Sequence, residues 1–304
     1  MAESCAWGLR IVSESMLPGC LPVAGPVASG PPLEIGFGAV PAVPGDARVA
    51  GPTIRVAGGN VWFHVAGMAA CCVRDGQVIT IEVEPGREGD DVLAALLAPL
   101  IALALHARGF LPLHASAVEV NDGAVAFVGR SCAGKSAIAA VLRARGRRLV
   151  CDDLCAVDTH TEGRPMLWPG PPSLRLWPDV LDALAIDHER TRPFRASLDK
   201  RVLEVSGVNG PLPIHHVTVI DARDAGGGID RRSGFDALSV LVASSWHATA
   251  LEAMQIRAAH FARCAHVARS AAIWHWSRPD GVQRMAGSLA GLEAAWRVAS
   301  ERRS

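Results

Sequence analysis

Residues 129–136 read Gly-Arg-Ser-Cys-Ala-Gly-Lys-Ser, which fits the pattern Gly-x4-Gly-Lys-Ser/Thr. Glycine lets the backbone turn so that its N–H groups approach phosphate oxygens without a Cβ in the way. The lysine after the second glycine supplies a cation to the β- and γ-phosphates, and the next hydroxyl supplies a ligand to Mg²⁺. The pattern therefore predicts a phosphate-binding loop (P-loop) that holds ATP together with Mg²⁺.

The sequence on either side of this loop has the character that a P-loop needs. An apolar stretch, 124–128, precedes it and indicates a strand, and an amphipathic stretch, 137–145, follows it and indicates a helix. The positive end of that helix would point at the same phosphates. The residues that we expect to bind the nucleotide are Gly129, Arg130, Ser131, Cys132, Ala133, Gly134, Lys135, Ser136 and Ala137.

Two carboxylates and a histidine are the next candidates for chemistry. Asp152 and Asp153 close a short apolar stretch, and the carboxyl end of a parallel strand is where ligands lie in an open α/β sheet. One carboxylate would hold Mg²⁺ and the other would accept a proton from an attacking hydroxyl; the alternative is a solvated acidic turn. His114 lies on a strand expected beside the P-loop strand, as a functional residue or as a core residue with a satisfied partner.

Basic residues beyond the P-loop could contact phosphate or substrate. Arginine favours planar, bidentate contact with phosphate, and lysine supplies a point charge. Arg175 and Lys200 are the first candidates for a catalytic contact, ahead of Arg195 and Arg201. The alternative for each of them is an exposed, solvated charge.

The elements that must position these residues follow from the apolar pattern. Asn-Asp-Gly at 121–123 separates apolar runs and predicts a hairpin of strands 113–120 and 124–128. A strand at 148–151, after the helix, completes a βαβ unit with the P-loop. Farther along, we expect a polar, basic loop at 190–201 and a helical stretch at 248–269.

The chain divides into two parts of different composition. Residues 1–88 are rich in Gly, Pro and Val, and short strands at 53–56, 61–65 and 78–83 predict a small β-rich N-terminal region. Residues 89–304 form the P-loop core, which opens with a helix capped by Asp90 or Asp91. The fold class that we expect is therefore α/β.

Composition narrows the classes of partner. The chain has 304 residues, and 30 Lys and Arg offset 30 Asp and Glu, so no net charge favours nucleic acid or an anionic membrane. The longest apolar run, 92–105, is shorter than the ~20 residues that span a bilayer, which favours a buried helix. The cysteines lack zinc-ligand spacing and the N-terminus lacks a basic signal segment, so we expect reduced thiols in the cytoplasm.

The block from residue 113 to 158, LHASAVEVNDGAVAFVGRSCAGKSAIAAVLRARGRRLVCDDLCAVD, resembles the catalytic core of the HPr kinase/phosphorylase family. That family and the phosphoenolpyruvate carboxykinases share a histidine, a P-loop and an Asp-Asp pair in this order. The resemblance implies an α/β fold with a P-loop core of that type and a serine kinase activity. It also implies that Lys135 binds phosphate and that Ser136 and Asp153 serve Mg²⁺. By the same resemblance Asp152 takes the proton of the substrate hydroxyl, and His114 lies near the transferred phosphate.

Departures from the family pattern bear on the acceptor. Cys132 stands where the family usually has glycine, and the N-terminal region and the stretch used for dephosphorylation have no clear counterpart. We therefore expect an acceptor other than HPr. Shorter relatives include kinases encoded beside ribosomally made peptides, such as lasso peptides, whose precursor they phosphorylate on serine. The N-terminal region would bind the peptide or mediate assembly, for example into a homo-oligomer.

The function expected from the sequence is an ATP- and Mg²⁺-dependent kinase that phosphorylates a serine of a protein or of a precursor peptide. Two alternatives stay open. The first is a small-molecule kinase built on the same core. The second is a nucleotide-binding switch with little turnover, which a Cβ at Cys132 in the loop favours and the Asp152-Asp153 pair disfavours.

Overall fold

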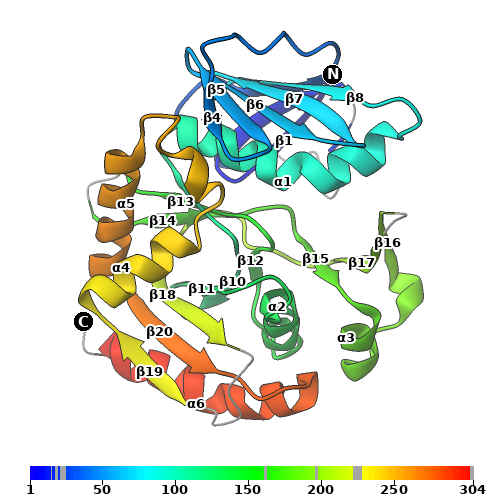
Figure 1. The fold of residues 1–304 in the computed structure, drawn as a ribbon. Helices are drawn as coiled ribbons and strands as arrows, with labels where there is room; N and C mark the ends of the chain where they lie inside the picture. The colour runs from blue at the N-terminus through cyan, green and yellow to red at the C-terminus, as the bar shows by residue number, and fades with distance from the viewer. Residues whose placement is uncertain are drawn as a thin grey trace.

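Two large sheets and one small sheet organise the chain into a mixed α/β protein (Figure 1). The computed structural model describes residues 1–14, 16–17, 20, 25–160, 163–195, 198–221 and 228–301. Among these residues, one sheet of eight strands is built from the N-terminal part of the chain, and one of nine strands carries the P-loop. The mixed α/β class expected from the sequence is confirmed.

The N-terminal sheet is larger than the few short strands that the sequence predicts. Its strands are β1 (Ala2–Ala6), β2 (Leu9–Ser13), β3 (Leu33–Phe37), β4 (Arg48–Ala50), β5 (Ile54–Ala57), β6 (Asn60–Val65), β7 (Ala69–Arg74) and β8 (Val78–Val83). Their order is β1-β2-β3-β8-β7-β6-β5-β4. Apolar and polar residues alternate in β2, where Leu9 and Ile11 are buried and Arg10 is exposed. One face of this sheet therefore needs a cover.

Helix α1 (Gly89–Ala107) supplies that cover by packing against β7 and β8. Asp90 and Asp91 lie in its first turn, where a negative charge complements the helix dipole. By length and composition the helix could cross a membrane, with a mean hydropathy of 1.7, but 72% of the apolar window is buried inside the protein. Such burial is typical of a core helix, as the apolar run in the sequence predicts.

The central sheet is formed by β9 (Leu111–Leu113), β10 (Ala115–Val120), β11 (Gly123–Val128), β12 (Leu149–Cys151), β13 (Cys155–Asp158), β14 (Met166–Trp168), β18 (Leu212–Asp221), β19 (Ile229–Arg232) and β20 (Ala272–Ser277). The parallel strands β11, β18 and β20 lie side by side. Strand β12 also runs parallel to β11, but β10 lies between them, antiparallel to both. The expected βαβ unit thus forms with the first strand of the hairpin inserted at its centre.

Helices cover both faces of the central sheet. One core contains α2 (Lys135–Ala144) and α6 (Val282–Glu301), where Phe127, Trp276 and Trp296 are fully buried. The other face packs against α4 (Gly234–Ala243) and α5 (Arg257–Ser270). This three-layer arrangement brings the carboxyl ends of β11, β12, β18 and β20 to a common edge.

The structure corrects two expectations, and the first concerns the small sheet. Its order is β15-β17-β16, from β15 (Ser173–Leu176), β16 (Thr191–Arg195) and β17 (Leu198–Glu204), and α3 (Pro178–Ala183) connects β15 to it. The predicted loop at 190–201 is therefore wrong over the described residues, because the polar strands pair with each other and with β15. The stretch 248–269 is also not one helix, since α5 starts only at Arg257 after a short 3-10 helix.

Candidate active site

The P-loop connects the end of β11 to the start of α2 at the common edge of the parallel strands. Gly129 has φ +149°, and a Cβ there would lie 2.8 Å from the carbonyl oxygen of Ile220 on β18. Gly134 has φ +96° and lies against the guanidinium of Arg278. Both glycines are therefore required by the close approach of neighbouring atoms and by a backbone geometry that side chains disfavour. The loop turns tightly enough to present its N–H groups to an anion.

Lys135 folds back across this loop. Its Nζ donates to the carbonyl oxygens of Gly129 at 2.9 Å and Arg130 at 3.1 Å. Burial lowers the pKa of Lys135, and the nearby charges of Asp153 and Asp152 oppose that shift. A phosphate beside the amine would add a further negative charge and favour its protonated form.

Asp152 accepts three hydrogen bonds. Its Oδ1 accepts from the hydroxyl of Ser116 at 2.5 Å and from the hydroxyl of Ser136 at 2.8 Å. Its Oδ2 accepts from the backbone N–H of Arg175 at 2.9 Å. This carboxylate therefore fixes the P-loop serine relative to β10 and β15, and it lies behind the main cavity rather than on its wall.

Asp153 faces the cavity. Its backbone has φ +71°, which turns the side chain away from that of Asp152. Its Oδ2 accepts from Arg175 Nη1 at 2.7 Å, and its Oδ1 lies 3.3 Å from Nδ1 of His114. Arg175 therefore holds both carboxylates, one through its backbone and one through its guanidinium.

His114 lies between β9 and β10 rather than within a strand, and its backbone N–H donates to Ser244 O at 2.8 Å. Its ring packs edge-on against Trp246, with centroids 4.9 Å apart. Burial and the charge of Lys135 lower the pKa of His114, and Asp153 opposes the shift. The contact with Asp153 is close but is not aligned as a hydrogen bond. The lowered pKa of His114 favours the neutral form of the imidazole beside Asp153.

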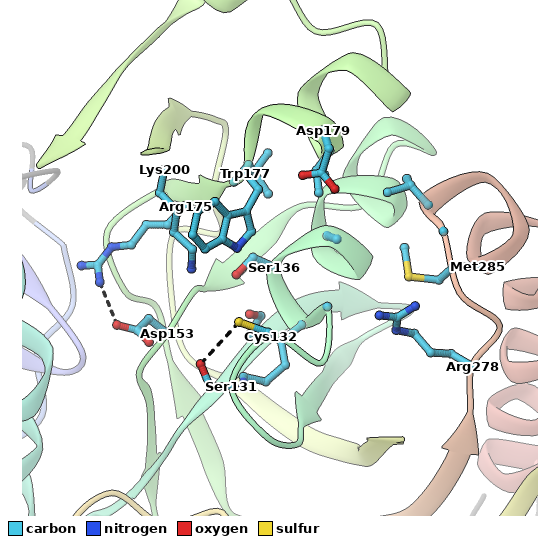
Figure 2. A pocket seen from close by; sticks show the side chains of 18 of the residues that line it. Ser131, Cys132, Ser136, Asp153, Arg175, Trp177, Asp179, Lys200, Arg278 and Met285 are labelled. Atoms are coloured by element: carbon cyan, nitrogen blue, oxygen red, sulfur yellow. Dashed lines mark hydrogen bonds and ion pairs between the residues drawn. The ribbon is translucent and has the colours of Figure 1, made fainter. Parts of the chain in front are cut away.

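These groups line one cavity of about 360 Å³ (Figure 2). Its wall includes the P-loop residues Ser131, Cys132, Gly134, Lys135, Ser136 and Ala137. Arg175 and Lys200 also line it, and the Lys200 ammonium lies 5.3 Å from the ring centroid of Trp177. Arg201 instead holds the β16–β17 hairpin through Thr191 and His188, and neither it nor Arg195 lines the cavity.

Several cavity residues were not singled out in the sequence, and Ser116, Trp177 and Arg278 are three of them. Ser116 lies on β10, two residues after His114, and in the single strand expected over 113–120 that spacing would have placed both side chains on one face. Trp177 directly follows β15 and Arg278 directly follows β20, and both strands are distant in sequence from the P-loop. Only the order of the strands brings Arg278 to the loop.

The oxygen atoms at the cavity wall and directly behind it fit Mg²⁺ if phosphate oxygens complete its coordination. Ser136 and Asp152 offer oxygen atoms only, which is the ligand type that Mg²⁺ prefers. Within the described ranges, no group of three or more His, Cys, Asp or Glu side chains could hold a metal ion by itself. A site that depends on substrate phosphates is the usual arrangement for this ion.

Comparison with known proteins adds little to this geometry. The sequence matches no protein-family model and no curated protein. The structure of an HPr(Ser) kinase/phosphatase from Coxiella burnetii is similar to 62% of this chain and 97% of that chain, with 12% sequence identity and a TM-score of 0.32. At this TM-score the similarity is too weak to support an inference, so the site is interpreted from its own residues.

Proposed function

We propose that this protein is a kinase that uses ATP and Mg²⁺ to phosphorylate a serine hydroxyl of a protein or peptide. The observation that carries the proposal is a single cavity in which a P-loop faces a carboxylate and two cations. Lys135 and Ser136 come from the loop, Asp153 from the end of β12, and Arg175 and Lys200 from the small sheet. A cavity that only bound a nucleotide would not need a carboxylate directed at the position of the terminal phosphate.

The loop would bind the triphosphate by its backbone N–H groups and by the positive end of α2. Lys135 would leave the carbonyl oxygens of Gly129 and Arg130 and turn to the β- and γ-phosphates. The residues that would hold Mg²⁺ are Ser136 directly and Asp152 through its contact with that hydroxyl. The ion would neutralise charge that develops on the phosphate oxygens.

In the transfer step, the acceptor oxygen forms a bond to the γ-phosphorus as the bond from that phosphorus to the β–γ bridging oxygen breaks. ADP leaves with the bridging oxygen, and the proton of the hydroxyl passes to a carboxylate. We assign the role of proton acceptor to Asp153, because this carboxylate faces the cavity. The sequence resemblance instead gives the proton to Asp152 and the Mg²⁺ contact to Asp153, but three hydrogen bonds occupy the Asp152 carboxylate. Arg175 and Lys200 would stabilise the charge on the transferred group.

The resemblance of residues 113–158 to the HPr kinase/phosphorylase core supports serine as the acceptor. Shorter relatives of that family phosphorylate a lasso-peptide precursor. The cysteines of the described chain are free thiols, and all but Cys5 and Cys132 are buried, which supports a cytoplasmic setting. Within the proposal, the N-terminal sheet contributes to acceptor binding or assembly.

Mass spectrometry of candidate acceptors after incubation with ATP and Mg²⁺ tests the proposal. The candidates are a serine-bearing precursor peptide, HPr and a metabolite pool, and Lys135→Ala is the control. Phosphate on a serine of the peptide or protein, lost in the control, is the expected result. Phosphate on a metabolite alone would indicate a small-molecule kinase. Bound ATP with no phosphorylated acceptor would favour a nucleotide-binding switch.

A further inference from the structure

Arg278 follows β20 and reaches the P-loop from the strand two positions away from β11. The residue is 9% exposed, and its Nε donates to the carbonyl oxygen of Ala133 at 2.7 Å. Its Nη1 donates to Pro279 O at 3.0 Å and lies 3.7 Å from a carboxylate oxygen of Asp280. A buried guanidinium is therefore fixed against the loop by three contacts.

The third nitrogen of this guanidinium, Nη2, can donate hydrogen bonds to a ligand. Within the described part of the chain, no hydrogen bond is formed by Nη2, and Arg278 lines the cavity. Nη2 lies 3.2 Å from the point where a Cβ of Gly134 would stand. The absence of that Cβ leaves the guanidinium beside the backbone that begins α2, where an anion would lie.

The cavity has two ends, and Arg278 marks one of them. The amine of Lys135 lies at the start of the loop, near the charges of Asp152 and Asp153, and a P-loop lysine serves the β- and γ-phosphates. In Figure 2, Asp153 and Arg175 lie on one side of Ser136, and Arg278 and Met285 lie on the other. A triphosphate whose γ-phosphate meets Asp153 therefore directs its α-phosphate toward Arg278.

Apolar side chains line the cavity together with the carboxylates of Asp179 and Asp280. Met285 is 1% exposed, and it lines the cavity together with Val282 and Val180. A nucleoside attached to the α-phosphate would bury its base against these side chains. Asp280 and Gly281 supply the polar rim of that end.

We propose that Arg278 binds the α-phosphate of the nucleotide through Nη2 while Nε keeps its contact with Ala133. The inference rests on the proposed nucleotide binding and adds an anion site outside the P-loop motif. Arg278 thereby makes the cavity select a nucleotide over a single inorganic phosphate, which the loop alone can hold.

The test compares ADP with inorganic phosphate on the full chain. Affinity for ADP with Mg²⁺ is measured by calorimetry and affinity for phosphate by ³¹P line broadening, for the wild type, Arg278→Ala and Arg278→Lys. We expect Arg278→Ala to weaken ADP binding about tenfold, because a charge-assisted hydrogen bond is lost, and to change phosphate binding by less than about twofold. Arg284→Ala is the matched control, since Arg284 is exposed on the same segment and does not line the cavity; ADP binding should not change.

An equal loss for both ligands would overturn the inference, because Arg278 would then only support the loop through Ala133. Unchanged ADP affinity in Arg278→Ala, or an equal loss in Arg284→Ala, would overturn it as well. If Arg278→Ala does not fold, Arg278→Lys decides: the ³¹P resonance of the bound α-phosphate should move and that of the β-phosphate should not. A stationary α resonance rejects the contact. A wild type that binds no ADP would instead reject the proposed function.

Discussion

At the scale of single residues, the two adjacent carboxylates have opposite surroundings. Asp152 accepts three hydrogen bonds behind the P-loop, whereas Asp153 contacts a guanidinium and an imidazole at the cavity wall. The positive φ of Asp153 produces this division, because it turns neighbouring side chains to different sites. A carboxylate that already accepts from two hydroxyls and an amide is suited to hold a structure in place.

The variants Asp153→Asn and Asp152→Asn separate the two roles. We expect Asp153→Asn to lower kcat about a hundredfold or more, with ATP affinity near that of the wild type, since the proton acceptor is lost. We expect Asp152→Asn to weaken binding of ATP with Mg²⁺, since Ser136 loses its partner. Steady-state kinetics and calorimetry measure both effects. Lost turnover with intact nucleotide binding in Asp152→Asn would return the base role to Asp152.

Cys132 is the other residue whose backbone matters. It is an exposed residue of the loop with φ +64°, a conformation that costs a side chain about 1–2 kcal/mol relative to glycine. Its side chain lines the cavity, and within the described part of the chain the thiol has one hydrogen-bond contact, with the hydroxyl of Ser131 at 3.8 Å. The residue therefore adds strain that no strong contact offsets.

We expect Cys132→Gly to raise the free energy of unfolding by about 0.5–1 kcal/mol, because relief of strain exceeds the added entropy of the unfolded chain. Cys132→Ala keeps the Cβ and should give no such gain. Urea unfolding of both variants measures the difference. An equal gain in Cys132→Ala would show that the thiol, and not the backbone, is the cause.

At the scale of elements, the strand order assembles the site. Strands β11, β12 and β20 end at one edge and contribute the loop, the carboxylates and Arg278. A hydrogen bond from the end of α1 also supports the site. His106 is 1% exposed, and its Nε2 lies 2.8 Å from Trp246 O. Because Trp246 packs on the ring of His114, α1 supports this cavity-lining histidine through one contact.

Acidic pH should weaken this support. Burial lowers the pKa of His106 to about 3, whereas the unfolded chain has the ordinary value of 6.5. The unfolded state therefore binds more protons between these values, and the free energy of unfolding falls as pH falls from about 6.5 toward 3. Between pH 7 and pH 5, we expect protonation of His106 in the unfolded state to lower the free energy of unfolding by about 2 kcal/mol.

Urea unfolding at both pH values measures this cost. His106→Gln, which can keep a polar contact with Trp246 without titrating, should lose about 2 kcal/mol less than the wild type. His64→Gln is a control at an exposed histidine. If both variants show the wild-type pH dependence, His106 is not the source.

At the scale of the whole molecule, the N-terminal sheet is joined to the core formed by residues 89–304. One continuous apolar cluster contains strands of that sheet, α1, and Leu154, Ala156 and Trp168 of the core. Trp7 makes two of the polar contacts: its Nε1 donates to Leu154 O at 3.1 Å and its backbone N–H to Pro169 O at 2.6 Å. Leu154 directly follows the carboxylate pair, so the sheet is anchored at the site.

We expect scanning calorimetry to show a single transition for the full chain, since the two parts share this core. Trp7→Phe leaves Leu154 O without its donor and should lower the free energy of unfolding by about 2 kcal/mol. The whole transition should therefore move to lower temperature. Two resolved transitions, of which only one moves in Trp7→Phe, would show that the N-terminal sheet unfolds independently.

The sequence by itself determined the features that depend on near neighbours in the chain. The glycines and lysine of the loop, the strand before it, the helix after it and the Asp152-Asp153 pair follow from residue types at fixed spacing. The burial of α1 followed from one apolar run. Local conformation and burial of a continuous stretch are set by forces that act within that stretch.

Only the tertiary structure decided which distant residues meet. The insertion of β10 between β11 and β12 places Ser116 on Asp152, and β20 places Arg278 on the loop. The polar strands at 190–201 read as a loop because cross-strand pairing, and not their own apolar content, stabilises them. Strand order is a choice among alternative pairings of the same segments, and packing of the whole chain makes that choice.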